Sequence, residues 1–419
     1  MRYLYSITLS IGDFLLSFIS LFLPLFGGNS KFKKFVLGQK NVFKEIRKKY
    51  PHEEKKECIW IHAASLGEYG VARPIIKRLK AEKSCRIILT FFSSTGYEAL
   101  KDNHPDIDDV FYLPLDTRKN VNRFLDLIQP DKALFIISEY WINYLSELKH
   151  RNIPTFLISA IISEKAPFFK WYGGLYRSVL DAYTHIFVLN ESSKTNLNSL
   201  GYTRVSVSGD PLFDNTIAVA ETLYSNPIIE AFVKGKKTFI AGSISDEKDL
   251  SLVCSLANHN KDIRFIMVPH EIHSNLQQEY AQRIEGKVVC YSDCDETTDF
   301  SSTQVLVIDF VGALAYLYRY AQWAYVGGGF TPYLHSIIEA TVYGLPVSFG
   351  PKIHRKTTPL ELIRLNIGTI VQCEKDIISW FDFLRSDPEM EAEIRHKALR
   401  YTKENGGATT HIINLIRKA

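Results

Sequence analysis

The residues of this chain best suited to chemistry stand where short apolar runs end. The clearest is Glu68, which closes the segment His62-Ala63-Ala64-Ser65-Leu66-Gly67-Glu68 after an apolar run at 58–62. Open α/β sheets carry ligands and catalytic groups at the carboxyl ends of their strands. Ser65 and Gly67 are small enough to let a ligand approach the backbone. We expect a helix N-terminus here that keeps the Glu68 carboxylate ionised and able to accept a proton; the alternative is a glutamate that only caps the helix.

Two further strand ends in the first half of the chain carry polar side chains. Ser94 and Thr95 follow the apolar run 86–92, and their hydroxyls could bind a phosphate or a sugar. Glu139 follows the run 132–138 and could bind a hydroxyl or a cationic group. Each signal is weak by itself, but the carboxyl ends of parallel strands meet at one edge of a sheet. Together the three segments predict a site on that edge.

The second half of the chain repeats the pattern with other residues. Consecutive glycines after a strand allow close approach to the backbone, and a following helix N-terminus suits an anion. Glu339, one turn inside a helix expected from His335 onward, is placed to accept hydrogen bonds from a ribose. The sequence has no GxGxxG fingerprint and no P-loop, so it predicts a nucleotide cleft without identifying the nucleotide. The residues concerned are Ser243, Pro269, His270, Val311, Gly312, Ala313, Gly328, His335, Ser336, Ile337, Ile338 and Glu339.

Short apolar runs that alternate with amphipathic stretches predict the elements that position these residues. Runs of four to seven residues separated by helical spacers are typical of βαβ units and a parallel sheet. Helices are expected at 71–82, 118–128 and 191–200. Strands are expected in one series at 58–62, 86–92, 110–113, 132–138, 155–159 and 185–189, and in a second at 237–241, 264–268, 287–291, 305–308, 323–326 and 346–349.

The two series predict an α/β protein with two doubly wound, Rossmann-like domains that face a central cleft. A chain of 419 residues is long enough for two domains of ordinary size. The expected divisions are an anchor with a basic flank at 1–40, a first domain at 41–215, a linker at 216–236 and a second domain at 237–419. The net charge of +4 is small, and no DNA- or RNA-binding motif accompanies it, so no nucleic acid partner is expected. The six cysteines show no metal-ligand spacing and are expected to be reduced.

The N-terminal stretch 7–26 is almost wholly apolar, with Asp13 and Pro24 as its interruptions. Twenty apolar residues are about enough to cross a bilayer. A basic cluster follows, which would keep the rest of the chain on the cytoplasmic side. Membrane association is therefore expected. Because Asp13 is charged, a helix that lies in the membrane interface is an alternative to one that crosses the membrane. A helix buried against the first domain is the remaining alternative.

Taken in order, these segments resemble those of the transferases of 3-deoxy-D-manno-octulosonic acid (Kdo), which build the lipopolysaccharide inner core. The matching runs are His62 to Glu68, Glu139-Tyr140-Trp141-Ile142-Asn143, Ala241-Gly242-Ser243, Pro269-His270-Glu271, and Val326-Gly327-Gly328-Gly329-Phe330 through Glu339. The runs at 159–161 and 169–173 are similar to the Bacteroidetes branch. The resemblance covers nearly the whole chain, including the N-terminal anchor.

The resemblance implies a GT-B glycosyltransferase at the cytoplasmic side of the inner membrane that needs no metal or other cofactor. It would move Kdo from CMP-Kdo to a lipid A precursor, lipid IVA, with inversion at the anomeric carbon. Glu68 falls on the family's general base. Segments 269–270, 311–313 and 336–339 fall on the CMP-binding segments. Donor or acceptor contacts would come from Ser65, Gly67, Ser94, Thr95, Glu139, Ser243, Gly328 and His335.

The chain departs from the family pattern at donor positions. Ser336 stands where Asn is usual, Ala313 where Glu is frequent, and Thr358 in a stretch that is usually aromatic and acidic. Loss of an Asn hydrogen bond typically costs about 0.5–1.5 kcal/mol, which weakens a site without abolishing it. Two alternatives stay open: a GT-B transferase of another activated sugar, and a catalytically silent relative that binds nucleotide or glycolipid.

Overall fold

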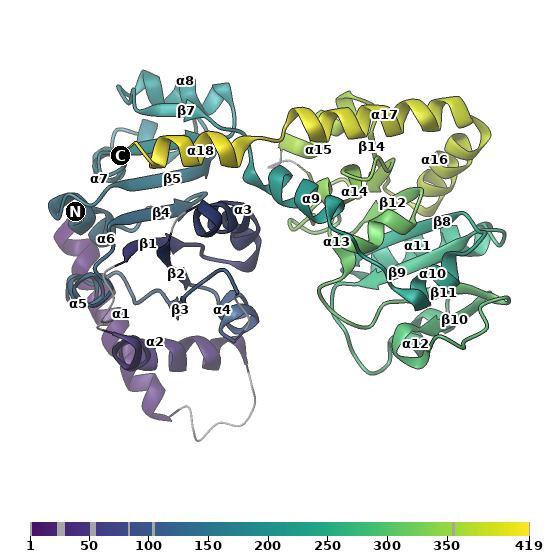
Figure 1. Cartoon of the computed structure of the whole chain (residues 1–419), viewed down its shortest axis with the longest axis horizontal. Helices are drawn as coiled ribbons and strands as arrows, with labels where there is room; N and C mark the ends of the chain where they lie inside the picture. The colour runs from purple at the N-terminus through teal and green to yellow at the C-terminus, as the bar shows by residue number, and fades with distance from the viewer. Residues whose placement is uncertain are drawn as a thin grey trace. The chain divides into compact units, whose positions relative to one another are not determined.

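The computed structural model describes residues 2–22, 30–50, 56–82, 84–102, 105–353 and 357–418. The chain forms two compact units, one of Met1–Asn215 with Gly406–Ala419 and the other of Thr216–Asn405. Each unit contains a seven-stranded sheet with helices against it (Figure 1). Every strand pair in both sheets is parallel. The predicted α/β class is confirmed.

The first sheet has the order β3-β2-β1-β4-β5-β6-β7, so the direction of winding reverses between β1 and β4. Such a reversal is a topological switch point, beside which open α/β sheets bind ligands. The strands are β1 (Glu57–His62), β2 (Cys85–Phe91), β3 (Asp109–Tyr112), β4 (Lys132–Ile136), β5 (Thr155–Ala160), β6 (His185–Val188) and β7 (Val205–Val207). The helices are α1 (Arg2–Phe22), α2 (Lys31–Lys49), α3 (Leu66–Glu82), α4 (Ser94–Leu100), α5 (Arg118–Ile128), α6 (Ile142–His150), α7 (Gly174–Leu180), α8 (Glu191–Ser199) and α18 (Ala408–Ile416).

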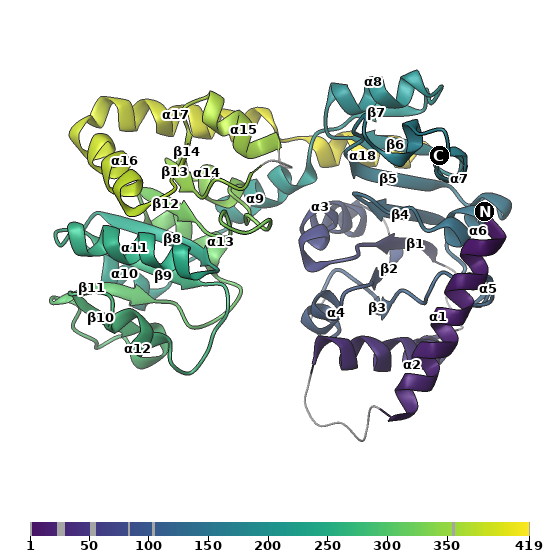
Figure 2. The ribbon, with the colours of Figure 1, turned by 180° about the vertical axis from the view of Figure 1, so that it is seen from behind.

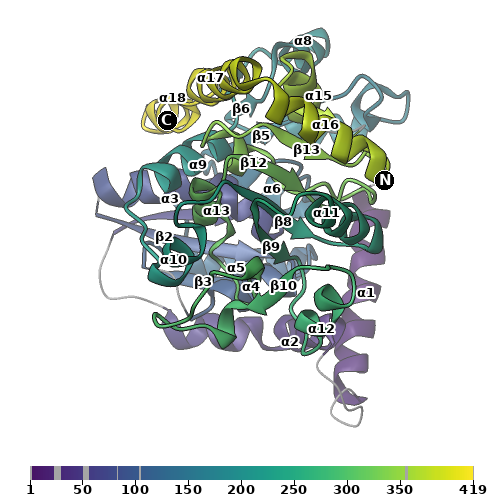
Figure 3. The same cartoon turned by 90° about the vertical axis from the view of Figure 1, so that its right-hand side faces the viewer.

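The second sheet has the order β10-β11-β9-β8-β12-β13-β14 and reverses between β8 and β12. Helices α11 and α16 lie side by side in this unit (Figure 3). The strands are β8 (Thr238–Ile244), β9 (Arg264–Pro269), β10 (Lys287–Cys290), β11 (Thr303–Val307), β12 (Trp323–Val326), β13 (Val347–Phe349) and β14 (Gly368–Ile370). The helices are α9 (Pro211–Glu221), which begins in the first unit, α10 (Pro227–Val233), α11 (Glu247–His259), α12 (Leu276–Ala281), α13 (Leu314–Leu317), α14 (Ile338–Thr341), α15 (Thr357–Arg364), α16 (Glu374–Ser386) and α17 (Pro388–Glu404).

The last helix, α18, differs from the expected division of the chain. The expected second domain ran to residue 419, but residues from Gly406 onward belong to the first unit. Ile412, Ile413 and Ile416 are buried in one cluster with side chains of α3, β1 and β2. The chain therefore returns to the first unit because the apolar face of α18 completes that core.

Two short strands were missed in the sequence. β7 and β14 have three residues each, and both lie at the edge of a sheet. Short edge strands carry too few apolar residues to stand out as buried runs. The central strands were recognised because both of their faces are buried; from Cys58 onward, for example, β1 is buried at every position.

Helix α1 lies along the α5 and α6 side of the first unit and is held there by its polar residues (Figure 2). Tyr5 donates a 2.7 Å hydrogen bond to Asp116, Ser6 donates to Asn143, and Asp13 accepts a 3.3 Å hydrogen bond from Asn120. Its other face is apolar and exposed at Leu4, Ile7, Ile11, Phe14, Leu15 and Phe18.

Among the described residues, Tyr3–Ser20 forms a helix that is long and apolar enough to cross a membrane by length and composition. The window is only 6% buried within the chain. A helix buried against the first domain, one of the expected alternatives, is therefore wrong. Residues 23–26 of the expected anchor lie outside the described residues.

Candidate active site

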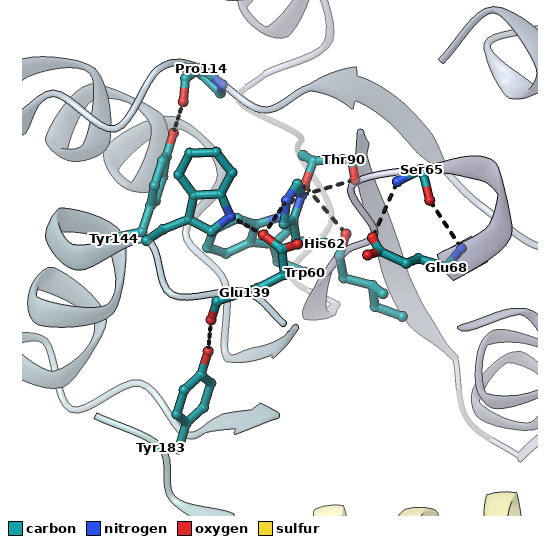
Figure 4. A network of polar contacts seen from close by, with 11 residues as sticks. Trp60, His62, Ser65, Glu68, Thr90, Pro114, Glu139, Tyr144 and Tyr183 are labelled. Atoms are coloured by element: carbon teal, nitrogen blue, oxygen red, sulfur yellow. Dashed lines mark hydrogen bonds and ion pairs between the residues drawn. The ribbon is translucent and has the colours of Figure 1, made fainter. Parts of the chain in front are cut away.

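Glu68 lies in the first turn of α3, directly beyond the end of β1. Its backbone N–H is 3.4 Å from Ser65 Oγ, while Glu68 Oε2 accepts a 3.2 Å hydrogen bond from the Ser65 N–H (Figure 4). This reciprocal arrangement is a capping box. The side chain is nevertheless only half-buried, and a carboxylate has about four acceptor positions. The capping interaction therefore leaves Glu68 able to accept a proton from a bound molecule.

The expectation that the helix N-terminus keeps Glu68 ionised is wrong. Burial, and then the charge of Glu139, raise the pKa of Glu68 to about 7, although His62 and the hydrogen bonds of Ala64 and Ser65 act in the opposite direction. Desolvation penalises the charged form more than the helix end favours it. Near neutral pH, Glu68 is thus poised between its two protonation states, which suits a general base.

Glu139 follows β4, on the other side of the switch point from Glu68. It is 7% exposed, and its Oε2 lies 3.3 Å from His62 Nε2. Trp141 Nε1 donates to the same carboxylate oxygen, and the Tyr183 hydroxyl donates to the Glu139 backbone carbonyl. The Glu139 carboxylate is therefore engaged by its own protein, and Trp141 orients it.

The backbone before Glu139 is strained. Ile137 has φ of 70°, a left-handed conformation that is unfavourable for a β-branched residue. Residues in such regions cost on the order of 1–3 kcal/mol and are concentrated at functional sites. Ser243 has φ of 54° at the end of β8 in the second sheet. Both strained residues stand at strand ends that the sequence had indicated as candidate sites.

The loop after β2 joins the same edge of the first sheet. The Ser93 N–H donates a 2.8 Å hydrogen bond to Ala64 O, which ties this loop to the loop that carries Glu68. Ser94 is buried and Thr95 is exposed at the start of α4. Gly67 is also exposed and has room for a Cβ atom. The three strand ends expected to share an edge do so, because β2, β1 and β4 are neighbours in the sheet.

His62 is the residue that the sequence reading undervalued, since it was taken only as part of a motif. It ends β1 and is fully buried. Its Nδ1 lies 2.9 Å from Thr90 Oγ1 and 3.1 Å from Thr90 O. Its place at the end of a buried strand was the only available signal, and that signal is shared by many structural histidines.

In the second unit, the buried carboxylate of Asp249 joins the loops on both sides of the switch point. Asp249 Oδ2 accepts hydrogen bonds from the N–H groups of Ser245 and Gly328, at 3.0 and 2.8 Å. Its Oδ1 accepts a 2.5 Å hydrogen bond from the Tyr325 hydroxyl. Asp249 was not predicted, because nothing in its helical sequence context distinguishes it from a helix-capping aspartate.

Two histidines meet at this edge of the second sheet. The rings of His270, after β9, and His335 have centroids 4.5 Å apart. His335 Nε2 lies 2.8 Å from Ser245 Oγ. Imidazoles and a hydroxyl together can hold an anionic oxygen by hydrogen bonds, and the pair becomes a stronger donor set when protonated.

The glycines after β12 serve the protein's own packing. A Cβ on Gly327 would lie 2.1 Å from Ser243 O, and one on Gly329 would lie 2.4 Å from Gly350 N. Gly328 has φ of 84°. The close backbone approach expected for a ligand is thus made, at Gly327 and Gly329, by neighbouring loops.

The expected helix from His335 is wrong in its start, because α14 contains only Ile338–Thr341. Glu339 is half-buried, and burial raises its pKa to about 7. In the described parts of the chain it accepts no hydrogen bond. Ser336 Oγ and the Tyr318 hydroxyl are buried without a hydrogen-bond partner there. These unused polar atoms give this segment capacity to bind a polar ligand.

The remaining expected nucleotide residues differ in access. Ile337 and Ile338 are buried, so they can offer a ligand only backbone groups. Val311 is 83% exposed, Gly312 has φ of 92°, and Ala313 is buried in the loop between β11 and α13.

A polar cavity of about 260 Å³ opens beside the ends of β8 and β9. Ser245 and Pro269 contribute to its lining, together with several carboxylates, among them Asp246, Glu247 and Glu271. This acidic lining suits hydroxyl or amino groups of a ligand and disfavours a phosphate. Within the described ranges, no cluster of three or more His, Cys, Asp or Glu residues could hold a metal ion.

Residues 41–215 match the family model described as 3-deoxy-D-manno-octulosonic-acid transferase (kdotransferase). The 3-deoxy-D-manno-octulosonic acid transferase of Chlamydia muridarum is 26% identical to this chain, over 86% of this chain and 85% of that protein. That of Aquifex aeolicus is 25% identical, over 85% and 96%. A bifunctional glycosyltransferase/methyltransferase of Fusobacterium nucleatum is 24% identical over 84% of this chain, which spans only 56% of that protein's length.

Solved structures share the fold at low sequence identity. UDP-GlcNAc 2-epimerase from Neisseria meningitidis, bound to UDP-GlcNAc, has a TM-score of 0.63 at 18% identity, over 87% of this chain and all of that one. MurG from Acinetobacter baumannii has a TM-score of 0.56 at 12% identity, again over 87% of this chain and all of that one.

Two parallel seven-stranded sheets, each with polar side chains at its switch point, give the chain a GT-B-like fold, which it shares with MurG and with UDP-GlcNAc 2-epimerase. Residues 41–215 match the Kdo transferase family model, and curated Kdo transferases are similar to the chain over most of its length.

Proposed function

We propose that this protein transfers Kdo from CMP-Kdo to a hydroxyl of a lipid A precursor, lipid IVA, with inversion at the anomeric carbon, in lipopolysaccharide inner-core synthesis. The observation that carries the proposal is Glu68, a half-buried carboxylate at the switch point of the first sheet with a pKa raised to about 7. The family supports the sugar, because the curated relatives of this length are Kdo transferases.

In this mechanism Glu68 removes the proton from the acceptor's primary hydroxyl. The acceptor oxygen attacks the anomeric carbon of Kdo, and the bond from that carbon to the CMP phosphate oxygen breaks on the opposite face. Glu68 ends the step protonated, and CMP leaves with the electron pair of the broken bond. A base with a pKa near the working pH gives the best compromise between ionised fraction and proton affinity.

Donor binding is assigned to the second sheet. His270 and His335, 4.5 Å apart, would hold the CMP phosphate. Glu339 would accept hydrogen bonds from the ribose hydroxyls, because it has no such bond among the described residues. The segments 269–270, 311–313 and 336–339 would form the nucleotide site, with backbone groups contributed at Ile337 and Ile338. The leaving group carries a single phosphate, so hydrogen bonds can stabilise it without a metal ion.

For the acceptor and the membrane, we propose that α1 places the first unit at the cytoplasmic face of the inner membrane. The exposed apolar row from Leu4 to Phe18 would enter the lipid, and its spacing of three and four residues puts it on one helix face. Arg118 and Lys119 line a hollow beside this row. Basic residues there would attract anionic headgroups and the phosphates of the acceptor. The hydrogen bonds of Tyr5, Ser6 and Asp13 favour a helix that lies on the membrane.

The test is transfer of Kdo from CMP-Kdo to a tetraacylated lipid A precursor, with wild type compared with Glu68→Gln and Glu68→Ala. Loss of the base is expected to lower the rate by about 10²–10⁴-fold while CMP binding stays intact. Glu191→Gln is the matched control, since Glu191 is a first-turn glutamate of α8 in the same unit, with a largely exposed side chain. Transfer that survives both Glu68 changes would contradict the assignment of the base. Absence of transfer by folded wild type that still binds CMP would contradict the function.

A further inference from the structure

A buried chain of polar contacts runs behind Glu68 (Figure 4). Trp60 Nε1 donates a 2.9 Å hydrogen bond to Thr90 Oγ1, which lies 2.9 Å from His62 Nδ1. On the other side of the ring, His62 Nε2 lies 3.3 Å from Glu139 Oε2. Trp60, His62 and Thr90 are fully buried. This series of polar contacts therefore connects the core of the sheet to the loop after β4 without exposure to solvent.

The neighbours of His62 determine where its protons lie. Thr90 O is a carbonyl oxygen and can only accept, so Nδ1, 3.1 Å away, carries a hydrogen. Nε2 is buried and has no hydrogen bond of good geometry within the described residues, and the nearby acidic group is Glu139. A bare nitrogen facing an ionised carboxylate would be repulsive in a buried site. A proton on either His62 Nε2 or Glu139 Oε2, which lie 3.3 Å apart, removes this repulsion.

We propose that His62 is a positioning residue for the transfer reaction: it shares this proton with Glu139, holds that carboxylate against Trp141, and partly offsets the negative charge that Glu139 directs at Glu68. The proposal rests on the proposed role of Glu68 as the base. The imidazole then controls the base through a second carboxylate, without contact with either substrate.

The ionisable groups that face this site come from a small number of elements. Glu139, from the loop after β4, and His62, from the end of β1, act on Glu68 with opposite signs. Tyr140 and Tyr183 lie against Glu139, and burial raises the pKa of each well above its ordinary value, so both stay neutral across the working range. A change in the titration of Glu68 near neutral pH can thus be attributed to His62 and Glu139.

The test compares His62→Gln, Glu139→Gln and the double variant in the pH dependence of kcat/KM for the acceptor. The acid limb reports the free enzyme's base. In His62→Gln the charge of Glu139 is no longer offset, so the limb is expected to move to higher pH by about one unit. In Glu139→Gln that charge is absent, so the limb is expected to move to lower pH. The double variant should return toward wild type, because the two residues act as one unit.

A second readout separates this proposal from the proposed function. Infrared difference spectra of the ligand-free protein, with Glu68→Gln as the reference, follow the Glu68 carboxyl group directly and need no turnover. The same opposite displacements are expected there even if the wild type fails to transfer Kdo. His185→Gln is the matched control, because His185 is a half-buried histidine of the same sheet bonded to Ser206. An unmoved Glu68 titration in folded His62→Gln, or displacement of both single variants in the same direction, would overturn the proposal.

Discussion

Replacement of Glu68 by Gln should stabilise the first unit at alkaline pH and leave its stability nearly unchanged at acid pH. The pKa of Glu68 is raised from the ordinary 4.5 to about 7 in the folded protein. The folded state therefore binds this proton more tightly than the unfolded state does. Its contribution to stability is fully present below pH 4.5 and is lost as the pH rises through 7. Gln cannot ionise, so it avoids this loss.

The size of the effect follows from the raised pKa. The interval from 4.5 to about 7 corresponds to about 3 kcal/mol. Glu68 is only half-buried, and solvent screening reduces this figure to about 1–2 kcal/mol. For a unit of this size, such a gain raises the melting temperature by about 2–8 °C. The Gln side chain keeps an oxygen that can accept from the Ser65 N–H, so the capping interaction is largely retained.

The assay is thermal melting of wild type and Glu68→Gln at pH 5 and pH 8, with hydrogen exchange in β1 and α3 to assign the transition to the first unit. Asp376→Asn is the control of opposite sign. Asp376 occupies the same capping position on α16, but hydrogen bonds from the backbone of Gln372 and the N-cap residue Cys373 lower its pKa. That variant should lose stability at pH 8. An equal gain for Glu68→Gln at both pH values, or a loss at pH 8, would refute the reasoning.

Two further predictions concern the proposed nucleotide site and the exposed apolar face of α1. Cytidine, which lacks a phosphate that titrates in this range, should bind about tenfold more tightly at pH 8 than at pH 6. Burial raises the pKa of Glu339 to about 7, and the ionised carboxylate is the better acceptor for ribose hydroxyls. Calorimetry should show that this pH dependence is lost in Glu339→Gln, and its persistence there would exclude Glu339 as the source. The double variant Ile11→Ser, Phe14→Ser should weaken binding to anionic vesicles by more than tenfold in a flotation assay, because two exposed apolar side chains are lost from the lipid-facing row of α1. Thr8→Ala, on the same helix, should bind as wild type does. Equal binding by wild type and both variants would place the membrane contact elsewhere.

The central strands and the position of the strand ends could be predicted from the sequence because they follow from local burial. A run such as 58–62 is apolar on both faces, and only a strand inside a covered parallel sheet satisfies that pattern. Parallel strands then bring their carboxyl ends together at one edge. The place of Ser65, Glu68 and Glu139 on that edge follows from these two facts alone.

The terminal helix and the glycine run could not be predicted in the same way. The apolar face of α18 shows that it packs on something, but the partner is decided by which unit has an uncovered face. Likewise, three consecutive glycines indicate that another group lies close to the backbone, but they do not indicate which group it is. The structure places Ser243 and Gly350 there, and no local pattern near residue 327 indicates either of them.

The protonation of the candidate base shows why chemistry is harder to infer than fold. Glu68 and Asp376 share one local motif, the third helical residue of a capping box, and a local argument gives both a lowered pKa. Asp376 follows that argument, because hydrogen bonds from Gln372 and Cys373 lower its pKa. Glu68 departs from it first because burial penalises its charged form, and second because the sheet order sets β4 beside β1, which brings the carboxylate of Glu139 to the same edge. The proton affinity of Glu68 therefore depends on its burial and on the strand order around it, and a change at His62 should alter it while the Ser65–Glu68 cap stays intact.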